Sequence, residues 1–105
     1  MVTLENISKG IGFNYPEEIV QKLASTDNVR IERIMSPESD VPSHVYDQDE
    51  GELVVLEHGY AELEFTDSKQ VVKMRRGDYI NIEPHLKHRV LRTIKGTSWL
   101  CVFYK

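Results

Sequence analysis

Apolar and polar side chains alternate in short runs through the second half of the chain. The alternation is strict over residues 60–65, where the three apolar side chains fall on one face and the acidic ones on the other, as in a half-buried strand. Turn-forming pairs such as Glu50-Gly51 and Gly77-Asp78 separate these runs at intervals of about 7 to 12 residues. That spacing is typical of a sandwich or barrel of short antiparallel strands.

Further strands are predicted where β-branched and aromatic residues gather between the turns. They are expected at residues 29–32, 53–56, 71–74, 79–82, 89–94 and 99–104.

The chain before residue 29 has a different pattern. Pro16 is followed by two glutamates and then by Ile19, Val20 and Leu23 at helical spacing, which predicts a short helix that begins near the proline and ends near residues 25–28. The predicted fold is therefore all-β and antiparallel with a short N-terminal helix. Residues 1–28 are expected to form a helical extension, and residues 29–105 the barrel of a single domain.

Composition narrows the class of protein. The 105 residues suffice for one domain, and 40% hydrophobic with 29% charged residues predicts a folded chain. The net charge of −4 disfavours a nucleic-acid partner, and no apolar run reaches the roughly 20 residues of a membrane helix. The single cysteine excludes an intrachain disulfide. A soluble, cytoplasmic protein is the expectation.

Acidic and basic residues are segregated along the chain. Residues 38–67 hold ten acids and no Lys or Arg, whereas residues 68–105 hold nine bases and two acids. Complementary charge on strands that pair with one another explains this division, and we favour that interpretation. The alternative is an acidic patch that attracts a cation or a basic partner.

Two polar residues share strand faces with apolar ones. Glu52 alternates with Val54 and Leu56, and His88 alternates with Val90. A carboxylate that faces a core is costly unless it is paired or binds a metal, and a carboxylate with an imidazole can hold a divalent ion. Either residue could instead lie at a barrel mouth in water.

These positions resemble the two sequence motifs of the cupin superfamily. Glu52 followed by Gly59 is similar to the second half of the first motif, and the run 77–82 with Pro84 and His88 is similar to the second. The resemblance spans about residues 45–104 and implies a small single-domain bacterial cupin. It further implies a β-barrel, or jelly roll, of two packed sheets with a divalent metal such as Zn, Mn, Ni or Fe inside.

The first motif departs from the metal-binding pattern. Where that pattern offers His-x-His, this chain has Tyr46 and Gln48, or Val45 and Asp47, and His44 has the wrong offset. The candidate metal ligands are therefore the two retained residues and four that could replace the missing pair: Glu52, His88, Gln48, Asp47, His85 and His44. An oxygen-rich set of this kind would suit Mn, Mg or Ca better than Cu. Alternatively, residues 47–50 bind no metal and form a solvent-exposed segment that leads into a hairpin.

Aromatic residues suggest a pocket beside these ligands. Tyr46, Tyr79 and Trp99 are expected to line it, although aromatic residues in a small barrel are more often core. Two functions stay open: a metal-dependent protein that binds a small-molecule ligand or substrate, and a degenerate cupin that binds a small ligand, or serves as a structural module, without metal. The sequence leaves catalytic residues and enzymatic activity undecided.

A homodimer is also expected, since a domain of this size buries a modest part of its surface and the resemblance implies a second copy. The predicted contact segments are Ile7, Ile11, Phe13 and the strand at residues 99–104.

Overall fold

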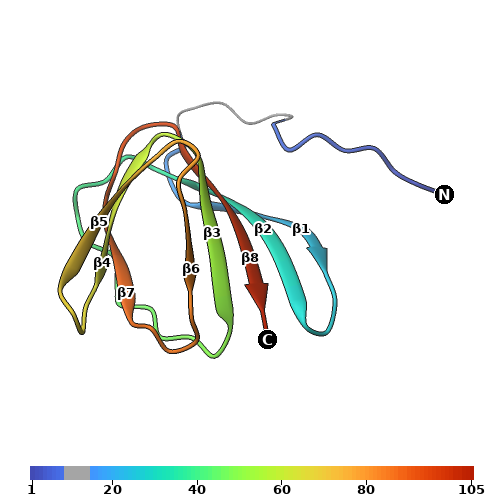
Figure 1. The fold of residues 1–105 in the computed structure, drawn as a ribbon. Helices are drawn as coiled ribbons and strands as arrows, with labels where there is room; N and C mark the ends of the chain where they lie inside the picture. Colours follow the sequence, from blue (N-terminus) through green and yellow to red (C-terminus); the bar gives the residue numbers. More distant parts are fainter. Residues whose placement is uncertain (9–14) are drawn as a thin grey trace.

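Segments with apolar side chains at every second position form eight strands in the computed structural model, which describes residues 1–8 and 15–105 (Figure 1). One antiparallel sheet has the strand order β1-β2-β8-β3-β6, and the other has the order β5-β4-β7. The predicted all-β class is confirmed. The strands are β1 (Ile19–Ser25), β2 (Val29–Ser36), β3 (Gly51–His58), β4 (Tyr60–Phe65), β5 (Gln70–Arg75), β6 (Tyr79–Ile82), β7 (His88–Thr93) and β8 (Thr97–Tyr104).

The helix predicted after Pro16 is wrong, because Ile19–Ser25 forms strand β1. This strand pairs antiparallel with β2, with Val20 opposite Ile34. A tight turn joins the two strands, in which the Thr26 hydroxyl accepts hydrogen bonds from the backbone N–H groups of Asn28 (3.3 Å) and Val29 (3.1 Å). Pairing along the edge of β2 therefore outweighs the helical spacing of a few apolar residues, two of which are β-branched and favour strands.

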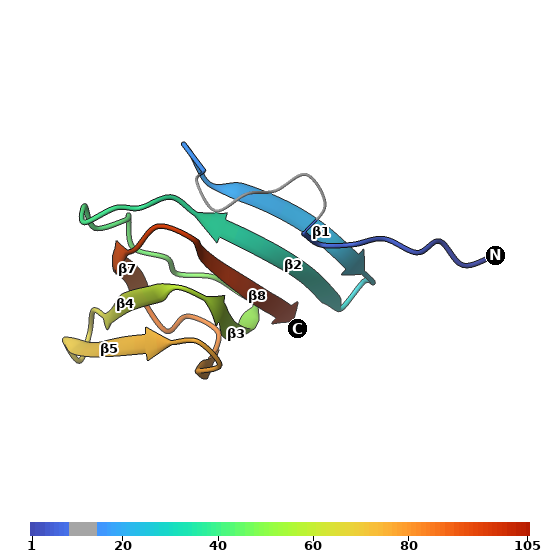
Figure 2. The same ribbon diagram turned by 90° about the horizontal axis from the view of Figure 1, so that it is seen from above.

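The hydrophobic core lies between the two sheets, which Figure 2 shows as layers seen from above. From the larger sheet, β3 and β8 contribute Val54, Leu56, Trp99 and Cys101, with Val54 opposite Cys101 and Leu56 opposite Trp99. From the smaller sheet, β4 buries the three apolar side chains of its alternating sequence. The strict alternation of residues 60–65 is thus explained by one core-facing and one outward face.

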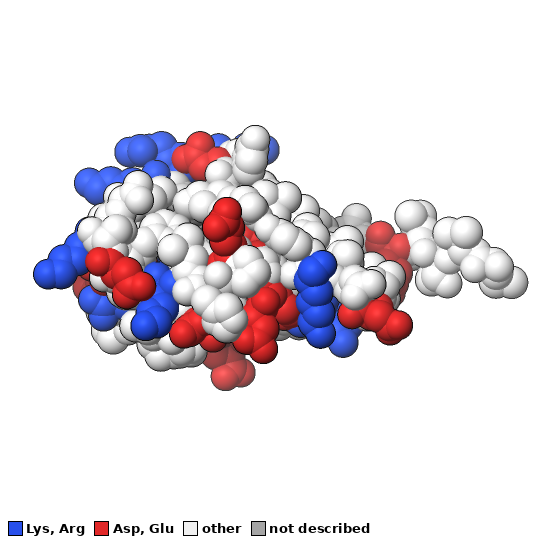
Figure 3. All heavy atoms as spheres, turned by 60° about the horizontal axis from the view of Figure 1, so that its bottom comes forward, with Lys and Arg blue, Asp and Glu red and all other residues white. Residues whose placement is uncertain are grey.

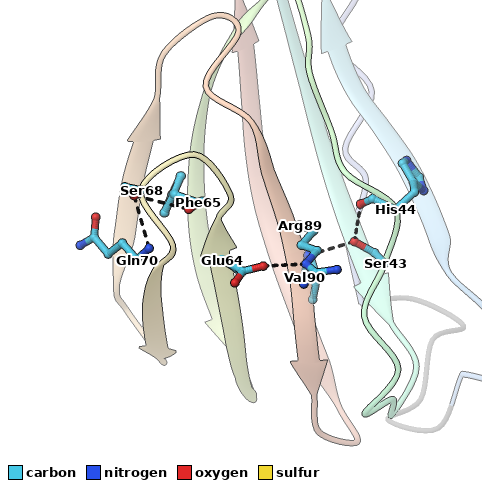
Figure 4. Close-up of polar contacts among 8 residues, drawn as sticks. All are labelled: Ser43, His44, Glu64, Phe65, Ser68, Gln70, Arg89 and Val90. Carbon is cyan, nitrogen blue, oxygen red and sulfur yellow. Dashed lines mark hydrogen bonds and ion pairs between the residues drawn. The ribbon is translucent and has the colours of Figure 1, made fainter.

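Charge pairing across β4 and β7 explains part of the segregation of acids and bases. Glu64 lies opposite Arg89, whose Nε is 2.7 Å from the Glu64 carboxylate (Figure 4). Glu62 lies opposite Arg92 at 3.8 Å. Complementary charge on paired strands is confirmed for these two pairs. As exposed or half-exposed ion pairs, each contributes at most about 1 kcal/mol to stability.

A buried arginine holds the N-terminal segment on the outer face of the larger sheet. Arg33 of β2 is buried, and its Nε donates a hydrogen bond to Glu57 of β3 at 3.0 Å. Its Nη1 donates to the backbone oxygen of Ile7 at 2.8 Å. No helix in residues 1–8 or 15–105 is long and apolar enough to cross a membrane.

The segment between β2 and β3 runs along β7 and is tied to it by the backbone. Isolated bridges join Ser39 to Thr93 and Tyr46 to His88. Between them, the Ser43 hydroxyl accepts a hydrogen bond from the N–H of Val90 at 2.9 Å (Figure 4). This segment, residues 37–50, therefore extends the smaller sheet, and it brings Tyr46 and Gln48 to the space between the sheets.

Candidate functional site

A cavity of about 230 Å³ lies between the two sheets. Its walls come from β1, β2, β3, β4, β6, β7, β8 and segment 37–50, so that nearly every strand contributes. Most of the wall is apolar. The polar and aromatic residues on which its chemistry depends are Glu52, His88, Gln48, Tyr46, Trp99 and Phe103.

Glu52 reaches this cavity because it is the second residue of β3 and shares the inner face with Val54 and Leu56. It lies opposite Phe103 of β8 and Ile82 of β6, and only 8% of it is exposed. The Gln48 amide donates a hydrogen bond to Glu52 Oε1 at 3.1 Å. The buried carboxylate is thus oriented by a neutral donor.

His88 begins β7 and faces Glu52 across the cavity. It is 5% exposed, and its Nδ1 lies 2.8 Å from the backbone oxygen of Leu86. Because a carbonyl oxygen only accepts, Nδ1 must carry a proton, which leaves Nε2 directed to the cavity. The Tyr46 ring stacks on the imidazole at 5.5 Å with an interplanar angle of 22°. These contacts fix both the tautomer and the plane of the ring.

The pair has one unfilled interaction. His88 Nε2 lies 3.9 Å from Glu52 Oε1, beyond hydrogen-bond range. When His88 is neutral, both atoms are acceptors that face a common point. A protonated imidazole, a cation, or a ligand that donates hydrogen bonds would satisfy both.

Other residues predicted for the site lie outside the cavity. His85 is exposed and contacts two aspartates, with Nδ1 2.8 Å from Asp47 Oδ1 and Nε2 3.3 Å from Asp49 Oδ1. This surface cluster follows from the turn after Pro84, where His85 has a φ of 63°. His44 packs against the Tyr46 ring at 4.2 Å and is exposed (Figure 4 shows it pointing away from β7).

Tyr79 does not line the cavity either. It is 70% exposed, and it lies opposite Val55 on the outer face of the larger sheet. Strand β6 has Ile80 and Ile82 on its inner face and Tyr79 with Asn81 on its outer face, so alternation indicates the place of Tyr79 and its aromatic character does not.

Sequence reasoning missed two carboxylates of the cavity, Glu18 and Glu32. Glu32 lies opposite Cys101, which faces inward. Residues 29–32 alone suggest that Val29 and Ile31 face the core and that Glu32 faces outward. The whole of β2, however, has apolar side chains on both faces. The useful signal was the alternation of Glu32 with Ile34, which also lines the cavity.

Cys101 is a buried thiol on the cavity wall. Burial raises the pKa of this thiol far above its usual value, and the nearby Glu52 charge and hydrogen bond add to the effect. The folded protein therefore keeps the thiol protonated, whereas the unfolded chain releases the proton above about pH 8.5. Such a group contributes stability below the unfolded pKa, and this contribution is lost as the pH rises.

We accordingly expect alkaline pH to destabilise the parent protein more than a Cys101→Ala variant. Between pH 7.5 and 9.5 the parent should lose about 1 kcal/mol of unfolding free energy in excess of the loss in the variant. Urea unfolding of both proteins at the two pH values measures this difference. Equal losses would show that the thiol ionises while the protein is folded.

Comparison with known proteins identifies the fold. No family model matches the chain, and no curated protein matches it. Among solved structures, a protein of Ralstonia eutropha JMP134, provisionally named a mannose-6-phosphate isomerase, is 31% identical over 99% of both chains, with a TM-score of 0.87. An RmlC-like cupin of Desulfovibrio desulfuricans is 15% identical over 99% of this chain and 97% of its own, with a TM-score of 0.72.

A cupin superfamily protein of Desulfitobacterium hafniense is 17% identical over 93% of this chain and 86% of its own, with a TM-score of 0.71. The chain has the cupin fold. Because the last two proteins are less than 25% identical, they support the cupin fold alone.

The cupin family implies a metal in the barrel, and the donor set here fits it poorly. Catalytic zinc sites use about three protein ligands. Glu52 and His88 supply two, and the described residues contain no group of three His, Cys, Asp or Glu side chains that could hold an ion. The Gln48 amide presents its NH₂ to Glu52, where a ligand to a shared ion would present oxygen. The geometry therefore favours another occupant at this pair.

Proposed function

We propose that this cupin binds a small organic molecule in its cavity, with Glu52 and His88 as the polar anchor. The observation that carries the proposal is the pair itself: two buried side chains with facing acceptor atoms 3.9 Å apart. Ligand sites are concave and largely apolar, with a few convergent polar groups. The cavity volume of about 230 Å³ lies below the roughly 300–1,000 Å³ of sites for drug-sized ligands, so the ligand is small.

A phosphorylated sugar is not favoured as the ligand. The name of the Ralstonia relative refers to mannose 6-phosphate, but no Lys or Arg of the described part of the chain lines the cavity of this cupin. Phosphate sites usually contain Arg, Lys or a helix N-terminus, and the described residues of the cavity wall include none of these.

Three compounds that carry one polar group on a cyclohexane ring test the proposal: cyclohexylamine, cyclohexanol and cyclohexanecarboxylate. Trp99 is the only tryptophan and lines the cavity, so its fluorescence reports on occupancy. At least one compound should change this fluorescence saturably. A His88→Ala substitution should weaken that binding about tenfold, since a hydrogen bond with a charged partner contributes about 1.5–3 kcal/mol.

The matched control is His85→Ala, which removes a histidine outside the cavity and should leave the affinity unchanged. If none of the three compounds changes the Trp99 signal at millimolar concentration, the small-molecule proposal fails. Titration with Mn²⁺ and Zn²⁺ under the same conditions tests the alternative occupant. If either ion binds saturably and His88→Ala abolishes this binding, Glu52 and His88 are metal ligands and the metal-dependent function is supported.

We also propose that two copies of this cupin associate through the outer face of the larger sheet. Apolar side chains there form two rows across the strands: Tyr79, Val55 and Leu100 in one, and Leu53, Val102 and Ile31 in the other. All six are exposed or half-buried in the single chain. Ile7 contacts Arg33 beside this face, whereas Ile11 and Phe13 lie outside the described residues.

A further inference from the structure

We infer that the ligand of this cavity is a small organic cation, a protonated amine attached to an apolar body. The inference rests on the proposed function and specifies its ligand class. Three observations lead to it: the sign of the charges around the cavity, the acceptor atoms at its polar end, and the aromatic rings in its wall.

The charges around the cavity are mostly negative. Among residues 1–8 and 15–105, three carboxylates line it, those of Glu18, Glu32 and Glu52, and no Lys or Arg does. Glu32 is paired with Arg30, whose Nε lies 3.1 Å away and whose Nη1 also contacts Glu50 at 3.0 Å, and Lys22 of β1 lies opposite Glu32 in the register. For Glu52 the nearest basic group within the described residues is His88 at 3.9 Å. Acidic side chains also gather near the middle of the face shown in Figure 3, with basic ones mostly toward its edges.

The polar end of the cavity offers acceptors to an N–H donor. His88 is 95% buried, since 5% of it is exposed. Its Nε2 lines the cavity and makes no hydrogen bond to the described residues. An ammonium group carries several N–H donors and a positive charge, so that it can bind Nε2 and the Glu52 carboxylate together. A hydroxyl has one donor and satisfies only one of the two, and a carboxylate has none and is repelled by Glu52.

The aromatic wall suits the same ligand. Tyr46, which stacks on His88, lines the cavity beside the polar pair, and Trp99 lines it further along β8, opposite Leu56. An organic cation is attracted to the faces of such rings. Within the chain, a cation already uses this interaction: the Arg30 guanidinium lies 4.1 Å from the centre of the Phe103 ring. An amine with an apolar body would therefore have its charge at Glu52 and its carbon atoms against aromatic and aliphatic side chains.

The three ring compounds named above test the inference with the parent protein, because they share the cyclohexane ring and differ in the polar group attached to it. Cyclohexylamine should bind at least tenfold more tightly than cyclohexanol, and cyclohexanecarboxylate should bind most weakly. Glu52→Gln keeps the shape and removes the charge. In this variant the affinity for the amine should fall to within about threefold of that for the alcohol, while the affinity for the alcohol stays unchanged.

The control variant is Glu64→Gln, which removes an outward-facing carboxylate of β4 and should keep the full preference for the amine. Binding of all three compounds with equal affinity would overturn the cation inference and leave the small-molecule function standing. Tighter binding of the carboxylate would do the same. Saturable cyclohexylamine binding that survives Glu52→Gln at full strength would also overturn it, since the charge would then act elsewhere. Binding of none of the three refutes the proposed function itself.

Discussion

Replacing Gly59 by alanine is expected to lower the free energy of unfolding by about 3 kcal/mol. Gly59 joins β3 to β4 with a φ of +89°, and a Cβ placed there would lie 2.6 Å from the backbone Cα of Thr97. The left-handed conformation costs a non-glycine residue about 1–2 kcal/mol, and forcing an extra carbon into a packed site adds about 1–3 kcal/mol. Thr97 is fully buried and donates a hydrogen bond to Ile94 at 2.7 Å, so it cannot move aside easily.

Gly77 provides a matched control for this prediction. It has the same φ of +89°, but a Cβ there would meet no atom within 4 Å. Gly77→Ala should therefore cost only the backbone term, about 1 kcal/mol. Thermal unfolding of both variants measures the difference, which should be about 10 °C for a domain of this size. Equal melting temperatures would contradict the assignment of the larger effect to the contact with Thr97.

Replacing Val55 by lysine is expected to convert the proposed homodimer into a monomer. Val55 lies between Tyr79 and Leu100 on the outer face of the larger sheet. Across a twofold interface each substitution occurs twice, so that two ammonium groups would be buried near one another. Sedimentation at micromolar concentration should show the parent at twice the 12.2 kDa of one chain and the variant at 12.2 kDa.

Val71→Lys is the control for this substitution. Val71 is an exposed valine on β5, in the other sheet, and a lysine there should leave the dimer intact. A parent protein that sediments only at 12.2 kDa would refute the homodimer. Dissociation by both substitutions alike would place the interface elsewhere.

The sequence predicted the later strands well because their signals are local. A turn residue at each end and alternation between them define β4 regardless of what packs on it. The same alternation places Glu52 and His88 on inner faces, where the structure brings them to 3.9 Å. Whether the pair holds an ion or a ligand depends on what lies opposite, and alternation within one strand does not contain that information.

The errors occurred where strand pairing decides the structure or where a residue was assigned by its type and not by alternation. Residues 19–25 satisfy a helical and a strand pattern equally, and only the edge of β2 decides between them. Tyr79 was assigned to the pocket as an aromatic residue, although Ile80 and Ile82 define the inner face of its strand. Asp47 and Gln48 are neighbours in the sequence, but their side chains point to opposite sides. Asp47 is exposed beside His85, and Gln48 contacts the Glu52 carboxylate. The bridge from Tyr46 to His88 fixes which of them points inward, and it links residues 42 positions apart (88 − 46).

Segment 37–50 has a consequence for how tightly the cavity can hold anything. Its bridges to β7 at Ser39 and Tyr46, with the Ser43 hydroxyl between them, make it part of a sheet. A mobile loop that closes over a ligand loses conformational entropy at that moment, and each immobilised side chain costs about 0.5–1.5 kcal/mol of affinity. Here Tyr46 and Gln48 are already ordered when the protein has folded. The wall is preorganised, so that little of the free energy of its contacts with an incoming molecule is spent on ordering these side chains.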